Sequence, residues 1–135
     1  MTIRGSCLCG STAYEASGTA EFRNCHCSRC RKSRGAAYAS NVFVRSGDFR
    51  WVRGDDLVVS YRLPGTPRFG NAFCRLCGSP MPRAVPGRDF VVVPAGSLDV
   101  EPGIRPGYHI FVGSKAAWHE ITDRLPQYEE YPPEG

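Results

Sequence analysis

The seven cysteines constrain this chain most, because they fall into three short clusters. In sequence order the clusters are Cys7-Leu8-Cys9-Gly10, Cys25-His26-Cys27-Ser28-Arg29-Cys30 and Cys74-Arg75-Leu76-Cys77-Gly78. An odd number of cysteines cannot all pair as disulfides within one chain, and such short spacings are typical of metal sites. The first residues carry no apolar stretch of the signal-peptide kind. We therefore expect a cytoplasmic protein whose thiols stay reduced.

The first and third clusters share one detail, a glycine directly after the second cysteine. Glycine adopts a positive φ without strain, so the turn can fold its backbone amides toward the two sulfurs. The two turns lie roughly 65 residues apart in the chain. Together they predict a closed structural zinc site with four thiolates, and its binding free energy would stabilise the fold. The expected ligands are Cys7, Cys9, Cys74 and Cys77.

The middle cluster offers three thiols and is followed by basic residues instead of glycine. Three protein ligands, Cys25, Cys27 and Cys30, leave one position of a tetrahedral zinc ion free, as in catalytic zinc sites. We expect this open site to carry the chemistry. The neighbouring cations would offset thiolate charge and are candidates for binding an anionic ligand. They are Arg29, Arg31 and Lys32, with Arg34 in the same basic cluster.

Spacing alone leaves other readings of the cysteines open. They could all be inert buried thiols, or the middle cluster could be a reactive loop without metal. The ligand sets could also mix clusters, and iron–sulfur ligation uses the same soft donors. No His-x-Glu occurs, which argues against a zinc deaminase, and the absence of His-Glu-x-x-His argues against a zincin protease.

The remainder of the sequence indicates a mainly β fold. The 135 residues, with 15 Gly and 11 Pro, suit one domain over 1–135 that is rich in turns, with about 128–135 an extended tail. Short β-branched and aromatic runs between turn signals predict antiparallel strands. The expected strands are Ser11–Ala16, Ala37–Val44, Phe49–Val52, Leu57–Arg62, Asn71–Phe73, Phe90–Pro94 and Tyr108–Val112. Short helical segments are expected at Ser28–Arg34 and Ser114–Ile121.

Net charge and hydropathy indicate which classes of partner are not expected. The net charge is +4, and no block of five like charges occurs, so a nucleic-acid partner is not expected. No apolar run approaches the roughly 20 residues of a membrane helix, so we expect no membrane association. The oligomeric state is left open.

Taken with the residues downstream, the cysteine clusters resemble the glutathione-dependent formaldehyde-activating enzyme family, which includes centromere protein V-like domains. The downstream matches are Ala95-Gly96-Ser97-Leu98-Asp99, His109-Ile110-Phe111-Val112, Ser114-Lys115-Ala116-Ala117-Trp118 and Asp123-Arg124-Leu125-Pro126-Gln127. The resemblance implies an Mss4-like β-tent, built from short antiparallel strands and stapled by zinc. It also implies the same division of the cysteines into one structural and one second zinc site.

The expected activity is that of a zinc-dependent carbon–sulfur lyase acting on a small thiol adduct. Formation of S-hydroxymethylglutathione from glutathione and formaldehyde is the example that the resemblance suggests, with glutathione as co-substrate. A non-catalytic carrier of glutathione, another thiol or zinc is the main alternative. A protein-interaction module is a further one, disfavoured because the chain has no long basic or disordered extension.

Overall fold

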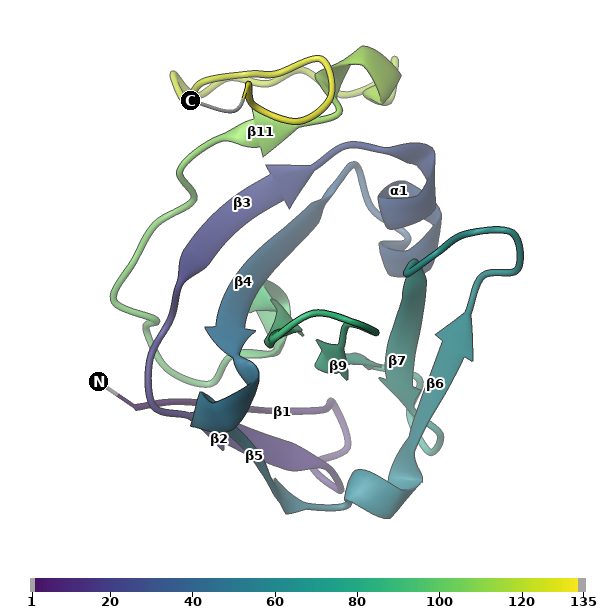
Figure 1. Ribbon diagram of the computed structural model, residues 1–135, viewed down its shortest axis with the longest axis vertical. Coiled ribbons are helices and arrows are strands. Elements are labelled where there is room, and N and C mark those ends of the chain that lie inside the picture. The colour runs from purple at the N-terminus through teal and green to yellow at the C-terminus, as the bar shows by residue number, and fades with distance from the viewer. Residues whose placement is uncertain (1, 134–135) are drawn as a thin grey trace.

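The structure, a computed structural model, describes residues 2–133, whose strands form three sheets (Figure 1). The first sheet has the order β1-β2-β5, the second β11-β3-β4-β10-β9 and the third β6-β7-β8. The strands are β1 (Ile3–Ser6), β2 (Ala13–Ala16), β3 (Glu21–Cys25), β4 (Ala39–Arg45), β5 (Phe49–Arg53), β6 (Val58–Arg62), β7 (Gly70–Cys74), β8 (Pro80–Met81), β9 (Arg83–Ala84), β10 (Phe90–Pro94) and β11 (His109–Ile110). One α-helix, α1 (Ser28–Arg34), joins β3 to β4, and short 3-10 turns cover Ser46–Asp48, Asp55–Leu57, Ala95–Ser97 and Val112–Ser114.

Strand pairing confirms the mainly β prediction. Within residues 2–133 every strand pair is antiparallel except β11 with β3, which run parallel. This parallel pair brings the C-terminal part of the chain onto the end of β3 that carries the middle cysteine cluster (Figure 1).

The largest apolar cluster lies where the first sheet meets β4 and β10. Val42 and Val44 of β4 and Val93 of β10 are fully buried and pack with Tyr14 of β2. Burying one such aliphatic side chain contributes about 1.5–3 kcal/mol. These contacts hold the first sheet against one end of the second, away from the middle cysteine cluster.

Several expected elements differ from the observed ones. All seven expected strands exist, Phe90–Pro94 with the expected bounds and the other six with shifted ends, but β1, β3, β8 and β9 were not expected. The sequence of β3 is Glu-Phe-Arg-Asn-Cys, and its polar residues give no β-strand pattern. It is a strand because it pairs with β4 on one side and with β11 on the other. The helix expected at Ser114–Ile121 is wrong, because only the 3-10 turn Val112–Ser114 forms there.

The segment after β11 returns along that strand. The amide of His109 donates to the carbonyl of Pro126, and the amide of Tyr128 donates back to the carbonyl of His109. Tyr131 then packs edge-on against Phe111, with ring centroids 4.9 Å apart. Part of the expected tail is therefore paired; Glu134 and Gly135 lie outside the described residues.

Candidate metal centres and the adjoining cavity

Four cysteines from the two distant Cys-Gly turns meet in one place. The sulfurs of Cys7, Cys9, Cys74 and Cys77 all lie within 4.8 Å of one another. The first two follow β1, and the other two stand at the end of β7 and in the turn to β8. We call this set the four-sulfur group. The structure thus assembles the four residues that the glycine pattern singled out.

Both turns have the backbone that the glycines were expected to permit. Gly10 has φ +79° and Gly78 φ +76°. The amide of Gly10 donates to the carbonyl of Cys7 at 3.0 Å, and the amide of Gly78 donates to the carbonyl of Cys74 at 2.7 Å. A β-carbon at either glycine would meet nothing within 4 Å, so backbone conformation and not crowding calls for glycine here.

Hydrogen bonds favour the thiolate form of two cysteines in the four-sulfur group, whereas burial raises the pKa of a third, Cys74. Burial also raises the pKa of Cys7, but hydrogen-bond contacts with the side chain and the amide of Thr12, and then with neighbouring cysteines, outweigh it and leave the pKa at about 7. The Thr12 amide donates to Cys7 Sγ at 3.3 Å. Contacts with the hydroxyl and amide of Ser79 lower the pKa of Cys77 to about 5. Deprotonated sulfurs are the form that binds metal.

The middle cluster forms a second group of sulfurs. Cys25 ends β3, and the sulfurs of Cys25, Cys27 and Cys30 lie within 4.8 Å of one another. Cys27 is the N-cap of α1, with its sulfur accepting from the amide of Cys30 at 3.3 Å. The strand end and the first helical turn therefore place the three thiols of what we call the three-sulfur group.

Ionisation within the three-sulfur group is uneven. Hydrogen-bond contacts with the thiols of Cys25 and Cys30 hold the pKa of Cys27 far below its usual range. The contact with Cys27 raises the pKa of Cys25 to about 11, and the contacts with Cys25 and Cys27 raise the pKa of Cys30 further. This pattern corresponds to a Cys27 thiolate that accepts hydrogen bonds from the two neighbouring thiols. A divalent cation bound to all three sulfurs would replace those protons.

The donor chemistry fits a soft or borderline cation in both groups. Four thiolates suit a closed tetrahedral zinc site, and three suit zinc with one further position. The described part of the chain contains these two groups of three or more close metal-ligating side chains. Either group could hold a metal ion, and the ligand roles of the individual cysteines remain predictions.

His26 points away from the sulfurs, into a buried network. Its Nε2 lies 2.8 Å from Nδ1 of His109, whose Nε2 lies 3.0 Å from Oδ2 of Asp123. The amide of Leu125 and then the His109 contact lower the pKa of Asp123, so its carboxylate accepts from His109 Nε2–H. His109 Nδ1 then accepts from His26 Nε2–H, which leaves the buried Nδ1 of His26 without a partner. His109 is therefore held by hydrogen bonds on both ring nitrogens.

A cavity of about 620 Å³ opens beside the three-sulfur group, and all three of its cysteines line the wall. That volume is within the range of sites for drug-sized ligands. Of the basic cluster expected to bind anions, Arg29 and Arg34 line the cavity, whereas Arg31 and Lys32 are not among its lining residues. The four-sulfur group does not line it.

Sequence reasoning missed most of the cations in this cavity. Four further arginines line it, coming from β3, the β6–β7 loop, β9 and the β9–β10 loop: Arg23, Arg68, Arg83 and Arg88. Burial lowers the pKa of Arg34, while its proximity to Cys30 and Cys25 opposes that effect. No local motif links the four further arginines, so nothing short of the strand pairing could have grouped them.

No helix in residues 2–133 has the length and apolar character needed to cross a bilayer. No curated protein matches this chain significantly. One solved structure that does match is described as a Rhodobacter sphaeroides protein from structural genomics. It is 31% identical, with a TM-score of 0.60, and the match covers 76% of this chain and 97% of the other.

A family model described as glutathione-dependent formaldehyde-activating enzyme matches residues 2–114. The match includes all three cysteine clusters, both sulfur groups and nearly all of the cavity lining. With its Mss4-like arrangement of short antiparallel strands, the chain belongs to the glutathione-dependent formaldehyde-activating enzyme family.

Proposed function

We propose that the protein is a zinc-dependent carbon–sulfur lyase that forms and cleaves the adduct of a small thiol with an aldehyde. Formation of S-hydroxymethylglutathione from glutathione and formaldehyde is the reaction that the family description suggests. The observation that carries the proposal is the three-sulfur group in the wall of a ligand-sized cavity. The four-sulfur group, outside that cavity, is proposed to hold a structural zinc ion.

The cavity wall suits such a thiol. Arg29 lies over the ring of Phe69, 5.9 Å from its centroid, and both line the cavity with the three cysteines. A guanidinium receives a carboxylate through paired N–H donors, so Arg29 can orient an acidic thiol with its sulfur toward the cysteines. A zinc ion bound at Cys25, Cys27 and Cys30 would supply one thing, a lowered pKa for the incoming thiol.

The bond changes balance without an oxidant or reductant. The substrate thiol first loses its proton to solvent. Its sulfur then donates an electron pair to the aldehyde carbon, and the carbonyl π pair moves to oxygen. The resulting alkoxide takes a proton, in this scheme from solvent, and the product is a hemithioacetal, the S-hydroxymethyl adduct in the case of formaldehyde. In the lyase direction the hydroxyl loses its proton, the carbon–sulfur bond breaks, the departing thiolate takes up a proton, and thiol and aldehyde separate.

Exchange NMR tests the proposal directly. Zinc-loaded protein is added to glutathione and formaldehyde, and the exchange rate between free and S-hydroxymethylated glutathione is measured. We expect acceleration in proportion to protein concentration, and its loss in Cys30→Ser with the circular dichroism spectrum of the folded chain retained. An exchange rate equal to the uncatalysed one, in a sample carrying two zinc ions per chain, rules out the enzyme.

The carrier alternative gives a different pair of results. Calorimetry would then show glutathione binding to the zinc-loaded chain, while the exchange rate stayed at its uncatalysed value. The pair of measurements therefore separates a catalyst from a carrier of the same thiol.

A further inference from the structure

The charge of the cavity is one-sided. Among the residues that the structure describes, six arginines line it, and no Asp or Glu does. The chain as a whole has 17 Lys and Arg against 13 Asp and Glu, so the cavity departs strongly from the average surface. The six are Arg23, Arg29, Arg34, Arg68, Arg83 and Arg88.

The protein itself hardly neutralises these cations. Within residues 2–133, only Arg23 of the six has a carboxylate within 4.0 Å, that of Glu21. A divalent cation on three thiolates leaves one net negative charge, which offsets one arginine at most. Like charges gathered around a partly enclosed space repel one another, and an anionic ligand relieves that repulsion.

Two of the guanidiniums are held in place with donors to spare. Arg34 Nη2 donates to Asn41 Oδ1 at 2.6 Å, and Arg83 Nη1 donates to the carbonyl of Arg68 at 2.9 Å. A guanidinium has five N–H donors, so both retain several. Arg83 Nε is buried and has no hydrogen-bond partner within residues 2–133, so the protein leaves part of this guanidinium unsatisfied.

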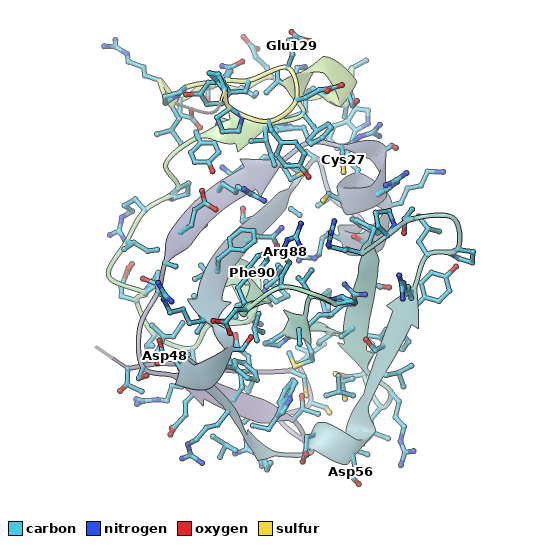
Figure 2. All side chains as sticks on the ribbon, viewed as in Figure 1. Cys27, Asp48, Asp56, Arg88, Phe90 and Glu129 are labelled. Atoms are coloured by element: carbon cyan, nitrogen blue, oxygen red, sulfur yellow. The ribbon has the colours of Figure 1, made fainter. Side chains whose placement is uncertain are left out.

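The cations stand on several walls of the cavity. Arg34 lies in the last turn of α1, the helix that contributes Cys30, and Arg88 lies in the loop between β9 and β10. In Figure 2 the labelled Arg88 lies in the middle of the view, below Cys27 and between the ribbons of β4 and β7. A ligand with its sulfur at the cysteines therefore meets cations along its length and not at one end alone.

We propose that the thiol taken by this cavity is a polyanion, with at least two carboxylate or phosphate groups and no ammonium group inside the cavity. The inference rests on the proposed function for the presence of a thiol, and it adds the charge of the remainder of the molecule. Glutathione itself carries one ammonium beside its two carboxylates, so it is not the best ligand by this criterion. Carboxylate and phosphate oxygens share the chemistry that a guanidinium binds.

A charge series on one peptide backbone tests the proposal. Binding to the zinc-loaded chain is measured by calorimetry for N-acetylglutathione, glutathione and glutathione diethyl ester, which differ in charge but keep the thiol. We expect affinity to fall in that order, with the diester at least about tenfold weaker than the N-acetyl compound, since a charge-assisted hydrogen bond is worth about that factor. Equal affinities of the diester and the N-acetyl compound overturn the proposal.

Arginine variants locate the effect. Arg34→Gln and Arg88→Gln are each expected to weaken N-acetylglutathione about tenfold and to leave the diester unchanged. Arg105→Gln is the matched control, because Arg105 is exposed, pairs with Glu101 and does not line the cavity. If Arg34→Gln does not fold, the Arg88→Gln variant still tests the proposal, because Arg88 is exposed. The same loss in the control, or no loss at Arg88, contradicts the inference.

Two more arms separate the acid groups and the two proposals. Mercaptosuccinate is a dicarboxylate thiol and phosphopantetheine is a phosphomonoester thiol. Whichever binds more tightly identifies the acid group that the cavity prefers. If neither binds better than glutathione diethyl ester, the polyanion proposal is overturned. S-methyl-N-acetylglutathione, which cannot react, should still compete. Charge-ordered binding without aldehyde exchange refutes the lyase alone, and exchange that is insensitive to ligand charge refutes the polyanion alone.

Discussion

His26 shows how one side chain beside two metal-site cysteines is excluded from the metal. It lies between Cys25 and Cys27 in the sequence, yet its ring is fully buried on the other side of the loop, tilted against Tyr38 at a centroid distance of 4.8 Å. Its hydrogen bond to His109 ties the cysteine loop to β11. Alternating side-chain direction at the end of a strand accounts for this orientation.

The pH dependence of stability is a prediction at this scale. Burial first, and then the neighbouring His109, lower the pKa of His26 from 6.5 to about 4. Between those two values the unfolded chain takes up a proton that the folded chain does not, so the free energy of unfolding falls as pH decreases through this window. Urea unfolding of the zinc-loaded chain at pH 7, 6 and 5 should show the decrease.

The His26→Gln variant is the comparison. Acid also weakens zinc binding in both chains, so the informative quantity is the difference between the two pH slopes. We expect a shallower slope in the variant, since the titrating group is gone. Parallel slopes would show that His26 does not titrate differently in the folded and unfolded states.

At the scale of elements, the two Cys-Gly turns show how local geometry prepares a metal site. Each turn follows or ends a strand, reverses the chain through a glycine with positive φ, and sets two sulfurs side by side. The middle cysteine cluster reaches the same proximity differently, from the end of β3 through the N-terminus of α1. The residues after the last cysteine of each cluster distinguish the two kinds of site in the sequence: a glycine follows in the four-sulfur group, and Arg-Lys follows in the three-sulfur group.

The turn glycines can be tested against a glycine of ordinary conformation. In Gly78→Ala the added methyl group meets nothing within 4 Å, but φ is +76°, so the strain of a left-handed backbone should cost about 1–2 kcal/mol of unfolding free energy. Gly47→Ala is the control, because Gly47 has open space around it and no positive φ. Denaturant unfolding measures both, and equal effects would show that the left-handed turn is not what destabilises the variant.

The elements also show where sequence patterns fail. Ser28–Arg34 is the observed α1, residue for residue, because a capping cysteine and a following Gly35 in the left-handed region delimit it locally. The short strands β8 and β9 could not be predicted from the sequence, since two residues show no periodicity. These strands form only because they pair with β7 and β10. The helix expected after residue 114 is absent; residues 111–113 instead bond to residues 128–130.

At the scale of the whole molecule, the two sulfur groups are expected to contribute unequally to the stability of the fold. The four-sulfur group joins segments roughly 65 residues apart, from β1 to the β7–β8 turn, whereas the three-sulfur group lies within six residues of chain. A crosslink over the longer loop removes about 4 kcal/mol of chain entropy from the unfolded state, against roughly 2 kcal/mol for the shorter one. If both groups hold zinc, the first should dominate stability.

Ligand substitution distinguishes them. We expect Cys74→Ser to unfold the chain or lower its melting temperature far more than Cys30→Ser, as followed by circular dichroism. Elemental analysis should show one zinc ion lost per chain in Cys30→Ser, and a strong chelator should unfold the parent chain. A Cys30→Ser variant that melts as low as Cys74→Ser contradicts this division between a structural and a working site.

The sequence by itself determined the grouping of the cysteines, the helix α1, most strands and the family. These depend on spacings of a few residues, where backbone geometry alone decides which atoms meet. Only the tertiary structure decided that six arginines line one cavity with the three-sulfur group and that His26, His109 and Asp123 form a buried network. Those side chains come from segments tens of residues apart. The pairing of β3 with β11 brings His109 to the cysteine loop, and the pairing of β10 with β4 and β9 places arginines from distant segments on one sheet; such pairing is a cooperative property of the whole chain.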